Sequence, residues 1–229
     1  MTKRFVIKAL EAKAVMKDYG DRPALGPVDV VVDEGQRVAI IGHNGSGKTT
    51  LLRIAAGLLD ATDGEVLVAG HSAGSLPARR LLSYLGDTPA FYDDLSVWEH
   101  LEYVARLHGV SDWEQRAADL LGHVGLFERA DDLPTRFSRG MRQKASIALA
   151  FIRPFSVLLV DEPFVGLDST GRVALVELLD GASAEGAAVI VATHEISFAA
   201  SAPRVVALRE GAIVFDGSPD GHDLHAYLG

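Results

Sequence analysis

A glycine-rich loop near residue 45 carries the clearest chemical pattern in the chain. Residues 42–49 read GHNGSGKT and fit the pattern G-x-x-x-x-G-K-[ST]. Glycines let such a loop wrap closely around phosphate oxygens, so that its backbone N–H groups and the start of the next helix face the anion. Lys48 can then reach the β- and γ-phosphates, and the Thr49 hydroxyl can bind Mg²⁺, which prefers oxygen ligands. The loop residues predicted to contact a nucleotide are Gly42, His43, Asn44, Gly45, Ser46, Gly47, Lys48, Thr49 and Thr50.

Two apolar runs end in residues suited to hydrolysis. VLLVDE, residues 157–162, ends in two carboxylates, and AAVIVAT is followed by His194. In open α/β sheets, ligands bind at the carboxyl ends of the strands. Asp161 is therefore predicted to hold Mg²⁺ through water, Glu162 to activate the attacking water as general base, and His194 to contact the γ-phosphate. A solvated acidic turn and a structural histidine are the alternatives.

The stretch TRFSRGMRQK, residues 135–144, places cations at the unfavourable end of a helix. Ser138 is a suitable N-cap, and apolar residues then recur with helical spacing until Pro154. Arg139 and Arg142 fall in the first turn, where the helix already carries about half a positive charge and each cation costs roughly 0.3–1 kcal/mol. Either this face is solvated, or an anion binds there.

Composition excludes several classes of site. The 229 residues carry a formal net charge of −9 and no cysteine. A disulfide framework and a thiolate metal site are therefore excluded, and the acidic balance argues against a nucleic-acid partner. No apolar run reaches 18 residues, and Lys8 interrupts the apolar residues near the start, so we expect neither a membrane span nor a signal peptide, and a cytoplasmic location.

Strands and helices alternate along the chain, which predicts an α/β fold with a mostly parallel sheet. Residues 1–87 and 155–229 are expected to form this core together with a β subdomain, and residues 88–154 read as successive helices inserted into it. The apolar runs RVVAL and AIVFDG flank Arg209-Glu210-Gly211, which predicts a hairpin.

The ordered motifs resemble those of the nucleotide-binding subunit of an ABC transporter, over essentially the whole chain. GHNGSGKT resembles the Walker A loop, VLLVDE the Walker B strand, FSRGM the LSGGQ-like signature, GLD at 166–168 the D-loop, and Thr193-His194 the switch histidine. Tyr19 stands where that family stacks an aromatic residue on adenine; ordinary strand packing is the alternative. The resemblance implies one domain with a P-loop NTPase ABC-type ATPase core, an N-terminal antiparallel β subdomain and an inserted α-helical subdomain.

The resemblance also implies an activity and partners. In that family, two subunits close head to tail around two ATP molecules with Mg²⁺ and drive transport through a separate integral membrane permease. We therefore expect an ATPase that acts as a homodimer, is peripheral on the cytoplasmic face of the membrane, and drives transport in the direction of export. Glu162, His194 and Lys48 would be catalytic. Ser138, Arg139, Gly140 and Asp168 would contact nucleotide across the dimer.

Three positions depart from the family pattern. Arg139 replaces the first glycine of the signature pair, which adds charge near ATP and disfavours positive φ. Met141 replaces the usual glutamine. Asp87 stands where the family has a glutamine near Mg²⁺ and the attacking water; it can offer an oxygen to Mg²⁺ or be a turn residue only. With these departures the chain resembles bacterial export-type subunits of the ABC-2 kind and, more weakly, haem-export ATPases.

Two alternative functions and the position of the permease-facing surface can also be judged from the sequence. A soluble ABC ATPase acting on a non-transport partner complex would carry coiled coils, zinc modules or a second ATPase domain, which do not fit this chain. A small-molecule kinase would not use the signature, the D-loop and the switch histidine together. The stretch Phe91–Tyr103 is the expected permease-facing surface, although its aromatic residues Phe91, Tyr92 and Trp98 fit a core equally well.

Overall fold

The computed structural model describes residues 8–20 and 23–228, which form two compact units. The first combines the chain up to Tyr84 with Phe155–Glu162 and the part from Ala182 onward; the second combines Leu85–Pro154 with Pro163–Gly181. The expected helical insertion ended at residue 154. In the structure the second unit also includes Pro163–Gly181, because this segment contacts the inserted helices. The N-terminal segment considered for a signal peptide lies largely outside the described residues.

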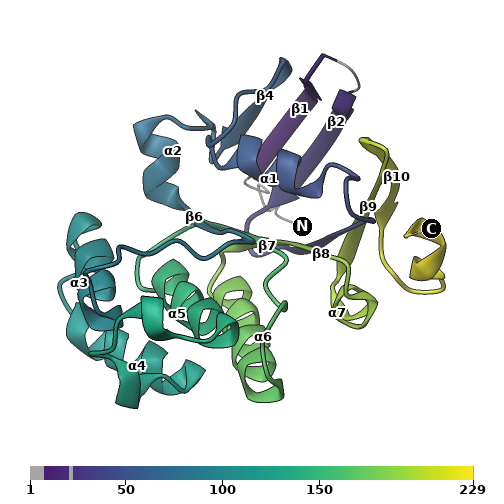
Figure 1. Ribbon diagram of the computed structural model, residues 1–229. Coiled ribbons are helices and arrows are strands. Elements are labelled where there is room, and N and C mark those ends of the chain that lie inside the picture. The colour runs from purple at the N-terminus through teal and green to yellow at the C-terminus, as the bar shows by residue number, and fades with distance from the viewer. Residues whose placement is uncertain (1–7, 21–22, 229) are drawn as a thin grey trace, which may run out of the picture. The chain divides into compact units, whose positions relative to one another are not determined.

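An antiparallel sheet of four strands forms one layer of the first unit (Figure 1). Its strands are β1 (Lys8–Asp18), β2 (Pro23–Asp33), β4 (Asp63–Val68) and β5 (His71–Ser72), in the order β2-β1-β4-β5. In β2, buried Val28, Val30 and Val32 alternate with more exposed residues. This period of two is that of a strand with one face on the core.

A six-stranded sheet forms the other layer. Its strands are β3 (Arg37–Ile41), β6 (Leu82–Leu85), β7 (Val157–Asp161), β8 (Ala188–Thr193), β9 (Arg204–Arg209) and β10 (Ala212–Gly217), in the order β10-β9-β3-β8-β7-β6. The pairs β3–β8, β3–β9 and β7–β8 are parallel, and every residue of β7 and β8 is buried. Continuous apolar runs are typical of such central parallel strands. The predicted β9–β10 hairpin is confirmed.

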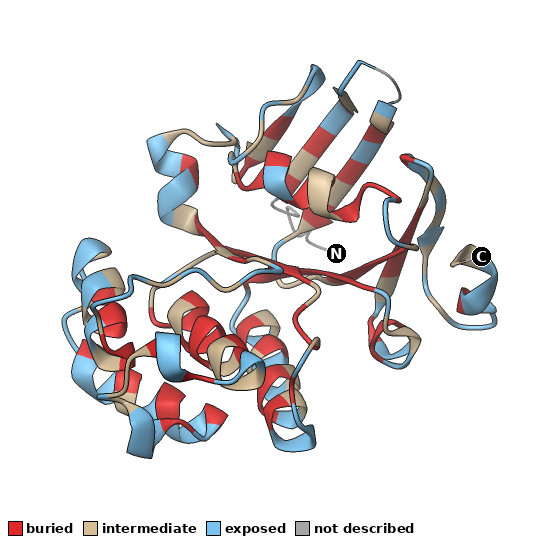
Figure 2. Ribbon diagram, viewed as in Figure 1, coloured by how far each residue is buried: buried red, intermediate tan, exposed pale blue. Residues whose placement is uncertain are grey.

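Helix α1 (Lys48–Ala55) lies between the two sheets and contacts both (Figure 1). Its side chains Leu51, Leu52 and Ile54 are buried in a core that both sheets share. Figure 2 shows buried positions in red on this helix and on strands of both sheets. The remaining helices of the unit are α2 (Leu76–Leu81), α7 (Ile196–Ser201) and the 3₁₀ turn η3 (Leu224–Tyr227). The start of α1 is thus held at the sheet edge where the phosphate loop ends.

The second unit is helical, as predicted. It contains α3 (Val97–Leu107), α4 (Trp113–Val124), α5 (Arg139–Phe151), the 3₁₀ turns η1 (Phe127–Arg129) and η2 (Pro134–Arg136), and most of α6 (Ser169–Ala184). Ser138 caps α5 as expected, since its hydroxyl accepts from Met141 N–H at 3.3 Å. Among the described helices, none is long and apolar enough to cross a membrane.

The caps of α3 and α4 allow a test of local stability. The Ser96 hydroxyl accepts from Glu99 N–H and the Glu99 carboxylate from Ser96 N–H, whereas Asp112 at the start of α4 makes no such side-chain bond within the described chain. We predict that Ser96→Ala lowers the free energy of unfolding by about 1 kcal/mol. Asp112→Ala, the matched control, should change it much less. Urea unfolding measures both, and equal losses would contradict the capping assignment.

Candidate functional site

The strand register brings the predicted catalytic residues to one edge of the six-stranded sheet. Ile41 of β3 pairs with Thr193 of β8, and Ala192 of β8 pairs with Asp161 of β7. The residues that follow these three parallel strands must therefore lie side by side. They are Gly42, His194 and Glu162, which the sequence predicted from three separate motifs.

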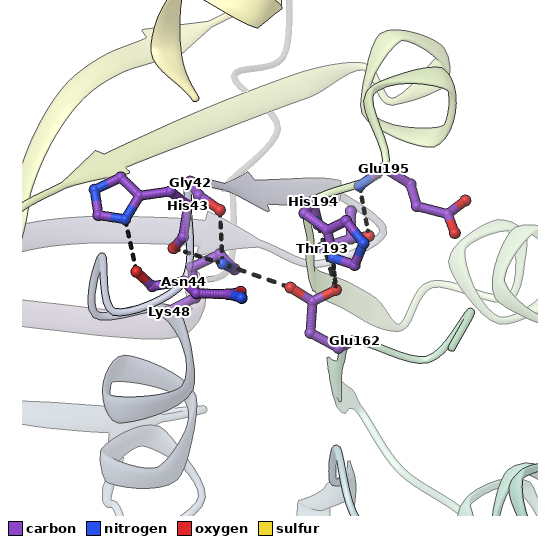
Figure 3. Close-up of polar contacts among 8 residues, drawn as sticks. All are labelled: Gly42, His43, Asn44, Lys48, Glu162, Thr193, His194 and Glu195. Atoms are coloured by element: carbon purple, nitrogen blue, oxygen red, sulfur yellow. Dashed lines mark hydrogen bonds and ion pairs between the residues drawn. The ribbon is translucent and has the colours of Figure 1, made fainter. Parts of the chain in front are cut away.

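The phosphate loop is folded around the Lys48 ammonium group. Nζ of Lys48 donates to the carbonyl oxygens of Gly42 at 2.7 Å and His43 at 3.2 Å, and Lys48 is only 5% exposed (Figure 3). Gly47 is the N-cap residue just before α1 and has a φ of 106°, and in the described chain no side-chain hydrogen bond caps this helix. The N–H groups of the first turn therefore keep their capacity for an anion.

Glu162 lies at the centre of the polar contacts in Figure 3. Its Oε2 is 2.8 Å from Nδ1 of His194, and its Oε1 is 3.5 Å from Nζ of Lys48. The backbone N–H of His194 also donates to Oε2, at 3.3 Å. Because an ionised carboxylate only accepts hydrogen bonds, the His194 ring must carry its proton on Nδ1 in this arrangement. The three residues predicted to be catalytic thus form one connected group.

The backbone of Glu162 is held in an unusual conformation. Its φ is 46°, a left-handed value that costs a residue with a side chain about 1 kcal/mol or more. The Glu162 N–H donates to the carbonyl of Ala192 at 2.8 Å, which continues the β7–β8 ladder by one residue. This bond fixes where the strand ends and directs the carboxylate toward Lys48 and His194.

The loop and the neighbouring carboxylate fit a nucleotide with Mg²⁺. The Ser46 hydroxyl is buried and has no hydrogen-bond partner among the described residues, and a side chain added to Gly45 would meet open space. Asp161 is fully buried at the end of β7. In the described chain, no three His, Cys, Asp or Glu side chains form a ready-made metal site. Mg²⁺ commonly takes one or two carboxylates together with substrate phosphates, so this sparse set suits it.

Tyr19 lies near the end of the β1–β2 hairpin and is 64% exposed. Nζ of Lys17 lies 5.2 Å from the centre of its ring. The ring is therefore not part of the core, so ordinary strand packing does not account for it. An exposed aromatic face is what a nucleotide base requires for stacking.

The signature and D-loop residues contact one another in the second unit. A side chain added to Gly140 would lie 2.5 Å from the carbonyl of Gly166, so only glycine permits this approach. Asp168 accepts from Lys144 Nζ at 2.9 Å and from Gly171 N–H at 2.7 Å. The Lys144 ammonium, and next the Gly171 N–H, lower the pKa of the Asp168 carboxyl below its usual value.

Arg139 is the first residue of α5, with its stem beside Gly166. Gly166 is placed so that an added side chain would lie 3.4 Å from Cγ of Arg139. Since a helical φ is negative, the arginine meets no conformational penalty at the position where the family has glycine. The expected conflict with positive φ does not arise here.

Sequence reasoning missed two contacts of the signature helix. Lys144 is one of the cations of this stretch in the sequence, and in the structure it pairs with Asp168. The buried Gln143 donates from Nε2 to the carbonyl of Pro163 at 3.1 Å. Both lie in TRFSRGMRQK, but their partners are at least 20 residues away along the chain. Asp87, by contrast, is an exposed residue of the second unit, and its Mg²⁺ role stays a prediction.

Comparison with known proteins places these motifs in a family. A family model described as ABC transporter matches residues 25–165. A cytochrome c biogenesis ATP-binding export protein of Xanthomonas campestris is 36% identical and covers 81% of this chain and 86% of its own. An aliphatic sulfonates import ATP-binding protein of Pseudomonas aeruginosa is also 36% identical, over 90% of this chain and 74% of its own.

Solved structures agree with this assignment. A structure described as the ATP-binding subunit of an ABC transporter has a TM-score of 0.90 and 33% identity, and covers 96% of this chain and 97% of its own. A dimeric ATP-binding cassette in a post-hydrolysis state, bound to ADP and phosphate, has a TM-score of 0.84 and 28% identity, covering 93% and 100%. The predicted ABC-type α/β fold is confirmed, and the chain belongs to the ABC transporter family as an ATP-binding subunit.

Proposed function

We propose that this ATPase binds ATP with Mg²⁺ at the phosphate loop and hydrolyses it with Glu162 as the general base. The observation that carries the proposal is the position of the Glu162 carboxylate, between the Lys48 ammonium and the His194 ring at one sheet edge. A general base must be close to the proton it removes and held in a defined orientation. Binding of Oε2 to the His194 ring and backbone supplies that orientation.

Lys48 and His194 prepare the site for a triphosphate. The Lys48 ammonium is bound by loop carbonyls and Glu162, so incoming phosphate oxygens would find a buried cation already in place. His194 donates from Nδ1 to Glu162, which leaves Nε2 for the γ-phosphate or the attacking water. Mg²⁺, when bound by Thr49 and Asp161, would neutralise charge that develops on the phosphates. Tyr19 supplies the stacking surface for adenine.

We propose that two copies of the chain close head to tail around two ATP molecules. Ser138, Arg139 and Gly140 at the start of α5 would then face the γ-phosphate held by the other copy, with Asp168 nearby. An arginine at a helix N-terminus is unfavourable in the isolated subunit and favourable once an anion is present. The dimeric relative bound to ADP and phosphate supports this arrangement.

A membrane permease is the second proposed partner, and the aromatic residues of the second unit are its proposed contact. Tyr92 and Tyr103 are 57% and 48% exposed, and their rings meet edge to face. Tyr92 also stacks on the buried His100, which accepts from Tyr92 N–H through Nε2 at 2.9 Å. We propose that this ring pair binds the permease and that the complex acts in export. The permease makes the substrate contacts, so the identity of the substrate lies in that other chain.

Glu162→Gln tests the proposed base directly. The amide cannot accept a proton, so the ATP turnover rate should fall by about 100-fold or more, whereas ATP binding is kept. The variant should also form a dimer that depends on ATP. Phosphate release and size-exclusion chromatography with ATP measure the two effects. Normal turnover in this variant would exclude Glu162 as the general base.

Two substitutions of Arg139 separate its charge from its packing on Gly166. Arg139→Met keeps the stem and removes the charge, whereas Arg139→Gly removes both. If the guanidinium binds phosphate, both variants should weaken ATP binding in the closed dimer by about 10- to 100-fold, the effect of one charged hydrogen bond. ATP titration of the Glu162→Gln dimer background measures this. Unchanged ATP affinity in Arg139→Met would show that the guanidinium faces solvent and does not bind phosphate.

Tyr92→Ala with Tyr103→Ala tests the permease contact. Loss of two aromatic residues from an interface should weaken permease binding about 10-fold or more, and the ATPase rate of the isolated subunit should stay within about 2-fold. Phe127→Ala is a matched control, because Phe127 is a 51% exposed aromatic residue of the same unit. Copurification of the native complex from membranes measures binding. Retention of the permease by the double variant would contradict the assignment.

A further inference from the structure

The chain uses the same two-residue turn twice in its first unit. Glu210-Gly211 joins β9 to β10 with φ values of 49° and 78°, and Ala69-Gly70 joins β4 to β5 with 46° and 79°. Positive φ at both central residues is the type I′ turn that fits the twist of a hairpin. The two turns therefore have the same conformational cost, and they differ in what surrounds them.

Gly211 is wedged between the phosphate loop and β2, whereas Gly70 is open. The Gly211 N–H donates to the carbonyl of Ser46 at 3.1 Å, and the Gly211 carbonyl accepts from Gly26 N–H at 2.8 Å. A side chain added to Gly211 would lie 3.0 Å from the nitrogen of Gly26 and 3.1 Å from Cα of Leu25. One added to Gly70 would meet no described atom within 4 Å. The β9–β10 hairpin indeed lies beside β2 in Figure 1.

The phosphate loop meets this junction through its backbone as well. A side chain added to Gly47 would lie 2.9 Å from the carbonyl of Ala24 in β2, and one added to Gly42 would collide with the carbonyl of Leu208 in β9. The loop is thus seated on main-chain atoms of β2 and of the β9–β10 hairpin. Displacement of either support by a few tenths of an ångström would be transmitted to the loop, because close-packed backbone has no free space to absorb it.

We propose that Gly211 is a positioning residue for the phosphate loop and acts through the Ser46–Gly47 peptide. That peptide is planar and trans, so its C=O and N–H point in opposite directions. By binding the Ser46 carbonyl, Gly211 fixes the direction of the Gly47 N–H at the start of α1. Gly26 fixes Gly211 in turn. This inference rests on the proposed binding of ATP at the loop.

Gly211→Ala and Gly70→Ala form a matched pair that tests the proposal. Each places alanine at a φ near 78°, so the two variants share the same backbone strain, and Gly211→Ala should lose more thermal stability because its side chain also meets the backbone of β2. Only Gly211→Ala should weaken binding of ATP with Mg²⁺, by about 10-fold or more, since a misdirected Gly47 N–H would lose a hydrogen bond to a charged phosphate, which is worth about tenfold or more in affinity. Calorimetric titration of the full chain, at a temperature where both variants are folded, measures the dissociation constants.

Gly211→Asn separates steric displacement from backbone strain. Asparagine tolerates positive φ better than alanine but still has a side chain. It should recover part of the thermal stability while ATP binding stays weak. Recovery of wild-type affinity in Gly211→Asn would overturn the proposal, because backbone strain alone would then explain Gly211→Ala.

Gly26→Ala keeps the proposal testable if the Gly211 variants do not fold. Gly26 has no positive φ, and its added side chain would meet the Gly211 carbonyl at 3.3 Å. We expect ATP binding about 3-fold weaker with little change in stability; unchanged binding would overturn the proposal. If the wild-type chain itself binds no ATP, the proposed function fails. If the wild-type chain binds ATP and the variants bind it equally well, only the role of Gly211 fails.

Discussion

The register of three parallel strands is the constraint on which the site depends. β3, β8 and β7 are paired so that Ile41 lies beside Thr193 and Ala192 beside Asp161. A slip of one residue would move a strand end by about 3.3 Å and turn its side chains to the opposite face. The phosphate loop, the Glu162 carboxylate and His194 would then no longer meet. The buried apolar side chains on both faces of these strands hold the register.

Charge at this sheet edge is balanced within the chain. A nearly buried ammonium group is costly unless it is hydrogen-bonded and paired, and Lys48 has two carbonyls and the Glu162 carboxylate as partners. These partners are also the groups that ATP would engage or displace. The same contacts therefore hold the Lys48 ammonium group in a defined position within the subunit. The left-handed backbone of Glu162 is the local cost of directing its carboxylate there.

Signature and D-loop segments are joined within one subunit. Gly140 admits the carbonyl of Gly166, and Lys144 pairs with Asp168. Both proposed nucleotide contacts of the second unit therefore share one support on α5. The aliphatic stem of Arg139 also packs on Gly166, so this residue has a packing contact whether its charged group faces solvent or phosphate. These contacts within the subunit therefore explain part of why basic residues occur near the start of α5.

Features that depend on local patterns could be predicted from the amino-acid sequence. The phosphate loop, the Ser138 cap, the buried strands ending in Glu162 and His194, and the β9–β10 hairpin each follow from residues close together in the chain. Contacts between distant segments could not be predicted in this way: Lys144 with Asp168, and Gly211 with Ser46 and Gly26. The sequence does not distinguish a glycine that a turn requires from one that lets a neighbouring backbone approach closely. It also does not distinguish a lysine that forms an ion pair from one that does not. These contacts depend on how closely two backbones approach after folding, which no local pattern encodes.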